Sequence, residues 1–168
     1  METLIGILGW GIGAVVALFV LWQIFIAVRL GALAKKHGAA VDFATLELTW
    51  RPNQFLMAPA GATKAQAHAV SEVLPRPPAD VAEALRAVVS SQPATRILTR
   101  SGDGLSFTAV QQTRLMRYPD FVSVEVRAAE GGSVVLAYGR AVFGVRDFGV
   151  NRARIERWMR ELRARLGA

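Results

Sequence analysis

The chain has 168 residues, a hydrophobic content of 52%, a net charge of +7 and no cysteine. This length accommodates one modest domain together with an appendage. A chain without cysteine excludes disulfide bonds, lipoprotein attachment through cysteine and cysteine-ligated metal sites.

The N-terminal segment from Leu4 to Val28 is apolar and contains no charged residue. As a helix it would measure roughly 37 Å, which exceeds the bilayer hydrocarbon core of about 30 Å. The residues before it carry no basic side chain, and the apolar run is longer than the h-region of a signal peptide, about 7–15 residues. The sequence therefore predicts an uncleaved transmembrane helix.

The charges at the two ends of this helix predict its orientation. The basic residues Arg29, Lys35 and Lys36 follow the apolar segment, whereas the only charged side chain before it is Glu2. The positive-inside rule places the basic flank in the cytoplasm. We therefore expect a cytoplasmic globular domain, and a domain on the opposite face of the membrane is the alternative.

Small residues recur along one face of the predicted helix. Gly9, Gly13 and Ala17 are spaced four residues apart, and such faces allow transmembrane helices to approach closely. The alternative is that glycine and small residues are simply common in transmembrane helices. The prediction is a helix–helix contact at these three residues.

The segment after the anchor carries weaker signals. A strand is expected from Val41 to Trp50, and the prolines at 52 and 59 predict an ordered loop or a linker over residues 51–62. A short extended piece is expected over residues 69–74. We divide the chain into a membrane anchor with its basic flank (residues 1–34), a juxtamembrane segment with a candidate strand (35–50) and a globular domain (51–168).

A helix followed by four strands is predicted next. Asp80 as the N-cap and Glu83 three residues later form a capping-box pattern. Alternating apolar residues then predict strands over residues 95–100, 105–116, 121–127 and 134–142. The sequence Ser101–Gly104 between the first two strands is a hairpin-turn signal.

The last predicted helix closes the domain. Asn151 is the expected N-cap, and the apolar stripe consists of Ile155, Trp158, Met159, Leu162 and Leu166. Arginines, Arg154 among them, are expected mostly on the opposite side. The fold class predicted is α+β: an N-terminal transmembrane helix and a two-layer domain in which two helices flank a four-stranded antiparallel sheet.

Three stretches of the sequence resemble one known family. They are "RPNQFLMAP" from Arg51, "RYPDFVSVEV" from Arg117 and "YGRAVFGVRDFGVNRARIERW" from Tyr138. In this order they are similar to the motifs of the bacterial and plastid family called domain of unknown function 1499. Gln54 and Phe121 stand where many members have a cysteine and an acid. The resemblance implies a domain boundary near Arg51 and no established activity, and some members of the family are lipoproteins or plastid proteins. For this chain we expect a bacterial inner-membrane location.

One constellation of polar residues is a candidate pocket for an anion. Its members are Arg51, Asn53, Asp120, Arg140, Asp147, Asn151 and Arg152. Arginine forks and a helix N-terminus suit a carboxylate or phosphate. The alternative is structural, since Asp and Asn commonly cap helices and brace loops.

The remaining chemistry favours a binding role over catalysis. His37 and His68 lie outside any metal-ligand spacing, and the sequence contains no phosphate-binding loop. We expect no catalytic residue, metal or cofactor. The expected partners are the bilayer, other membrane proteins through the anchor and anionic lipid headgroups, but no nucleic acid. The predicted function is a non-catalytic binding or assembly module of a membrane complex, with an envelope enzyme or anion-binding protein as the alternative.

Overall fold

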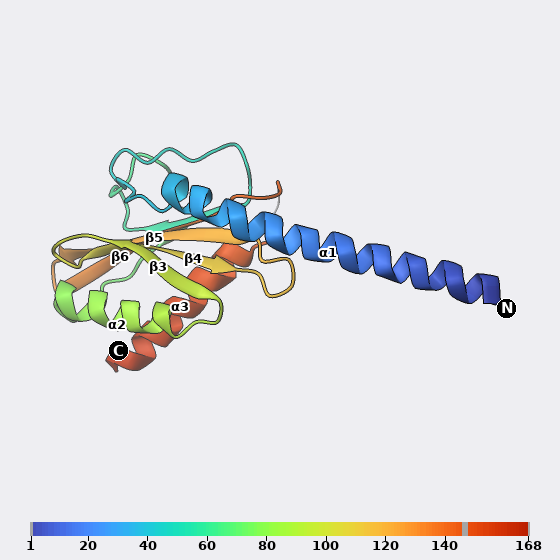
Figure 1. The fold of residues 1–168 in the computed structure, drawn as a ribbon. Coiled ribbons are helices and arrows are strands. Elements are labelled where there is room, and N and C mark those ends of the chain that lie inside the picture. Colours follow the sequence, from blue (N-terminus) through green and yellow to red (C-terminus); the bar gives the residue numbers. More distant parts are fainter. Residues whose placement is uncertain (1, 146–147, 168) are drawn as a thin grey trace.

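The computed structural model describes residues 2–145 and 148–167, with side chains from Gly9 onward. The helices in this part of the chain are α1 (Glu2–His37), α2 (Pro78–Ser90) and α3 (Val150–Leu166). The strands are β1 (Gln54–Ala58), β2 (Ala69–Val70), β3 (Thr95–Arg100), β4 (Ser106–Gln112), β5 (Pro119–Ala129) and β6 (Gly132–Ala141). Together they form an α+β domain with a long N-terminal helix (Figure 1).

Helix α1 projects far beyond the domain (Figure 1). Its segment Gly9–His37 is long and apolar enough to cross a membrane. The side chains of residues 9–21 are all exposed, whereas Ile26 is completely buried. The helix therefore has a free N-terminal part and a C-terminal part, from Trp22 onward, that packs on the domain.

The described strands form a six-stranded sheet in the order β2-β1-β6-β5-β4-β3. The pair β1–β2 is parallel, and the other neighbours are antiparallel. The predicted four-stranded sheet corresponds to β3–β6 and was therefore incomplete. Strand β1 occupies residues predicted as a loop, because Pro52 and Pro59 lie just outside it and disturb none of its hydrogen bonds.

The predicted strand over residues 41–50 is wrong. This segment is fully described and irregular. Phe43 is buried in a small hydrophobic cluster with Leu56 and Leu136, and Leu46 and Leu48 pack against that cluster. Its alternating apolar residues belong to a loop that packs on the sheet, not to a strand of the sheet.

The two faces of the sheet have different covers. Helices α2 and α3 pack on one face, where Trp158, Leu85 and Val122 belong to the main core. The last turns of α1 and the irregular chain after it lie over the other face, where Leu56, Leu136 and Phe43 form a smaller cluster (Figure 1). The predicted apolar stripe of α3 thus faces the main core, and so does the buried side of α2.

The predicted N-caps of both domain helices are wrong. Helix α2 starts at Pro78 with Pro77 in the cap position, so Asp80 lies in its first turn. The fixed φ of proline suits the first helical position. Helix α3 is preceded by Gly149 with φ 80°, and Asn151 lies inside the helix with its side chain fully buried.

Candidate functional site

The residues predicted to form one polar pocket lie in separate places, and Asp147 is outside the residues that the structure describes. Three of them, Asn53, Asp120 and Asn151, are buried on the side of the sheet that α3 covers. Arg140 lies on the opposite face. Arg152 is exposed and pairs with Glu156 at 2.8 Å.

Arg154 lies at the centre of the buried polar group, although it was predicted on the outer side of α3. Its guanidinium donates to Asp120 Oδ2 at 2.7 Å, to Asn151 Oδ1 at 2.6 Å and to Gln111 Oε1 at 2.5 Å. Only 4% of Arg154 is exposed. The spacing contained the signal, because Arg154 precedes the buried Trp158 by four residues and so shares its face. This network joins α3 to β4 and β5.

Asn53 and Asn151 brace the end of the sheet beside this network. Asn53 donates from Nδ2 to the Gly144 carbonyl at 2.8 Å, and its own carbonyl accepts a bond from Asn151 Nδ2 at 3.2 Å. A Cβ at Gly139 would lie 2.8 Å from Asn151 Oδ1, so β6 needs glycine where α3 crosses it. The contacts of these asparagines fit the structural alternative.

Arg140 fastens the end of α1 to the sheet. Its Nη2 donates to the carbonyl of His37, the last residue of α1, at 2.5 Å, and Nη1 donates to Ser123 Oγ at 3.1 Å. Its guanidinium also lies 5.2 Å from the Tyr138 ring centroid. Burial lowers the pKa of Arg140 and raises that of Tyr138. A cation at a helix C-terminus is favourable because the last carbonyls carry partial negative charge.

A basic cleft lies beside this contact. It has a volume of about 340 Å³, and its lining includes Lys36, Arg51, Gln54, Tyr138 and Arg140. Among the described residues that line the cleft there are three cations and no carboxylate. Three predicted pocket residues, Arg51, Asn53 and Arg140, therefore line this cleft, in an arrangement that can accept an anion.

A second hollow lies where α1 leaves the domain. Trp22 Nε1 donates to the Met116 carbonyl at 2.9 Å, and the Trp22 ring lies 5.4 Å from Tyr118 and 6.4 Å from Phe143. Gln23 Nε2 donates to the Leu115 carbonyl at 3.0 Å. The hollow beside these aromatic rings has a volume of about 460 Å³. The helix thus passes between the β4–β5 loop and the chain that follows β6 (Figure 1).

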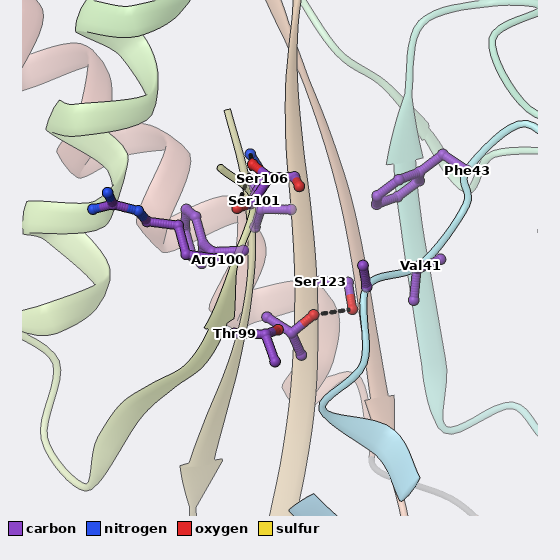
Figure 2. Close-up of a pocket in the computed structure, with 11 residues that line it drawn as sticks. Val41, Phe43, Thr99, Arg100, Ser101, Ser106 and Ser123 are labelled. Carbon is purple, nitrogen blue, oxygen red and sulfur yellow. Dashed lines mark hydrogen bonds between the residues drawn. The ribbon is translucent and has the colours of Figure 1, made fainter. Parts of the chain in front are cut away.

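Figure 2 shows a narrower hollow on the face of the sheet that α1 and the following loop cover, between the segment carrying Val41 and Phe43 and the strands. Thr108 and Ser123 share a hydrogen bond of 3.0 Å within it. Its volume of about 80 Å³ is well below the roughly 300–1,000 Å³ of ordinary ligand pockets. Arg100 extends away from it, so this hollow is a packing gap.

The histidines are engaged in structural contacts. His68 Nδ1 accepts the Leu56 amide at 2.9 Å, and its ring stacks on Phe55. The His37 ring lies 5.4 Å from Phe121. Within the described residues, no group of three or more His, Asp or Glu side chains is arranged to hold a metal ion.

The predicted small-residue face lies on the free part of α1. Gly9, Gly13 and Ala17 line a shallow groove together with Trp10 and Ala14. A Cβ at Gly9 or Gly13 would meet nothing within 4 Å. The face is therefore open to another molecule.

Comparison with known proteins identifies one family. A family model described as "Protein of unknown function (DUF1499)" matches residues 47–162. A solved structure of an uncharacterised protein from Rhizobium leguminosarum is 17% identical, with a TM-score of 0.37, and the match covers 58% of this chain and 91% of that one. The protein TTHA0849 from Thermus thermophilus is 13% identical, with a TM-score of 0.31, over 57% of this chain and 93% of that one. No curated protein matches the chain.

Proposed function

The chain belongs to the DUF1499 family of proteins of unknown function, and we propose that it is a single-pass membrane protein whose domain is a non-catalytic binding or assembly module of a membrane complex. The bacterial inner membrane is the proposed location. The basic residues Arg29, Lys35 and Lys36 favour a cytoplasmic domain.

The observation that carries this proposal is the division of α1. All side chains of residues 9–21 are exposed and predominantly apolar, with Trp10 at 84% exposure. Exposed apolar surface of this extent is unfavourable in water and favourable in a bilayer. Twenty helical residues span about 30 Å, the thickness of the hydrocarbon core, so the free part of α1 has the length needed to cross it.

The groove at Gly9, Gly13 and Ala17 supplies the contact with another membrane protein. Small residues let two helices pack at short range, which is the main attraction available between helices in lipid. No part of the described domain approaches these glycines, so substitutions there change the helix face without disturbing the fold.

Co-purification from membranes tests the proposal. The full chain, tagged at its C-terminus, is extracted in mild detergent, and its partners are identified by mass spectrometry. We expect a stoichiometric membrane protein with the native chain and its loss with Gly9→Leu plus Gly13→Leu. Gly11→Leu is the matched control, because Gly11 also has open space around it and points to a different side of the helix.

Two results would contradict the assembly role. One is a native chain that purifies alone, and the other is a partner that is lost equally with Gly11→Leu. A chain found in the soluble fraction would contradict the membrane anchor itself.

The basic cleft supports a second candidate function, the binding of a soluble anion. Lys36, Arg51 and Arg140 converge there, and none of the other described residues that line the cleft is a carboxylate. Arg51→Gln tests this candidate, because Arg51 is exposed and its guanidinium lies over Trp50 rather than in the core. Phosphate should raise the melting temperature of the native chain and have less effect on the variant; an equal effect would contradict a specific site.

A further inference from the structure

We infer that two loops of the domain insert apolar side chains into the membrane interface around the point where α1 leaves the bilayer, and that their partner is anionic lipid. The loops are residues 113–118, between β4 and β5, and the described residues 143–145 and 148–149, between β6 and α3, together with Val150 at the start of α3. This inference rests on the membrane anchor proposed above.

The depth of the two loops follows from the length of the free helix. If residues 2–21 of α1 fill the hydrocarbon core, at about 1.5 Å per residue, then Trp22 lies at the boundary between lipid and water. Trp22 and Gln23 are the residues that bond the carbonyls of Met116 and Leu115. The first loop therefore lies at the membrane surface.

The second loop lies at the same level. Phe143 packs against Trp22 with ring centroids 6.4 Å apart, and against Tyr118 at 5.6 Å. Tryptophan and tyrosine are the residues that concentrate at membrane interfaces, because each combines an apolar ring with a polar group. The aromatic cluster thus connects the helix, the first loop and the second loop at one depth.

Hydrogen bonds close the base of the first loop and leave its tip exposed. Thr113 and Tyr118 close it, since the Thr113 amide bonds the Tyr118 carbonyl and the Tyr118 amide bonds Thr113 Oγ1, both at 3.0 Å. At the tip, Leu115 is 69% exposed. Arg114 and Arg117 flank it and are also exposed. An apolar tip between two cations matches the boundary between acyl chains and anionic headgroups.

The second loop presents Phe148, whose side chain is 94% exposed. Its φ of 51° is in the left-handed region, which is unfavourable for a bulky residue. Neither burial within the domain nor backbone preference accounts for a phenylalanine here. Val145 and Val150 beside it are 51% and 43% exposed. Insertion into lipid would bury these side chains together.

Site-directed labelling can measure the depth of these side chains, because the native chain contains no cysteine. Leu115→Cys and Phe148→Cys are made separately in the full chain and labelled with a nitroxide. The protein is reconstituted in vesicles of phosphatidylcholine and phosphatidylglycerol. Collision rates with oxygen, which concentrates in lipid, and with a water-soluble nickel complex then report the depth of each label.

Two further positions serve as references. Ile12→Cys, on the free part of α1, reports the hydrocarbon core. Glu130→Cys is exposed in the β5–β6 hairpin, at the other end of strands about 33 Å long, and reports water. We expect the labels at 115 and 148 to resemble Ile12→Cys in oxygen accessibility much more than Glu130→Cys. We also expect them to move outward in vesicles of phosphatidylcholine alone.

The outcomes separate the inference from the anchor. A label at residue 12 in lipid with labels at 115 and 148 in water would overturn the inference and leave the anchor intact. A label at residue 12 in water would overturn both. Labels at 115 and 148 shielded from oxygen and from the nickel complex would indicate a protein partner and overturn the lipid assignment.

Discussion

The guanidinium of Arg154 is almost completely buried beside the Asp120 carboxylate. Removing one partner of a buried ion pair leaves the other charge in a low-dielectric site, which typically costs about 3–5 kcal/mol. We therefore predict that Arg154→Met lowers the free energy of unfolding by about that amount. Chemical denaturation of the full chain in detergent measures it.

Arg152→Met is the matched control on the same helix. Arg152 pairs with Glu156 at a similar distance but is 65% exposed, so water screens the pair. Its removal should cost about 0–1 kcal/mol. Similar losses for the two variants would contradict a structural role for the buried network. A second substitution, Asp120→Asn, should recover part of the loss in Arg154→Met, because it removes the charge left behind.

At the residue scale, several structurally important side chains could be predicted from the sequence, but their arrangement in space could not. Asp120 and Asn151 both bond Arg154, and Asn53 bonds Asn151 beside them. The predicted position of the α3 arginines on the outer side of the helix did not reveal this role of Arg154. Alternation along β5 and β6 separates Asp120 from Arg140, since neighbouring residues of a strand point to opposite faces. Whether two polar residues share a face depends on strand register, and composition does not contain that information.

At the element scale, the contact between α1 and the sheet depends on Arg140. Hydrogen bonds to charged groups contribute about 1.5–3 kcal/mol, and Arg140 makes one to the last carbonyl of α1. We predict that Arg140→Gln speeds amide exchange in the last turn of α1 roughly ten- to hundredfold. Hydrogen exchange followed by mass spectrometry resolves this segment.

Arg127→Gln is the control for this prediction. Arg127 lies on β5 and pairs with Glu125 at 2.6 Å, away from α1. Its substitution should leave exchange in α1 unchanged. If exchange in the last turn of α1 were equally fast in the native chain and in Arg140→Gln, the bond to the His37 carbonyl would not hold the helix in place.

Elements with strong local signals were predicted well, and those defined by tertiary pairing were not. The strand Thr95–Arg100 was predicted with its observed bounds, and the family resemblance is confirmed over residues 47–162. Strand β1 was missed because its five residues lie between two prolines and are held by pairing with β6. The segment 41–50 gave the opposite error, since apolar alternation does not distinguish a strand from a loop that packs on a sheet.

At the scale of the whole molecule, α1 has two roles that truncation can separate. In its free part the side chains of residues 9–21 are all exposed, whereas residues 22–37 lie over the sheet and Ile26 is completely buried. A form that begins at Trp22 should therefore keep the stability of the domain. A form that begins at Ala39 should lose about 3 kcal/mol or more, because burial of one large aliphatic side chain alone contributes about 1.5–3 kcal/mol.

Thermal and chemical unfolding of the two truncated forms decide between a helix that is part of the domain and a flexible tether. Equal stability of the two forms would show that residues 22–37 contribute nothing to the fold. The domain would then be free to rotate about its anchor, and the loops beside Trp22 would have no fixed depth in the membrane. A clear loss in the shorter form would instead mean that the packing of α1 on the sheet sets the orientation of the domain, since Trp22, Arg140 and the two loops belong to one rigid contact.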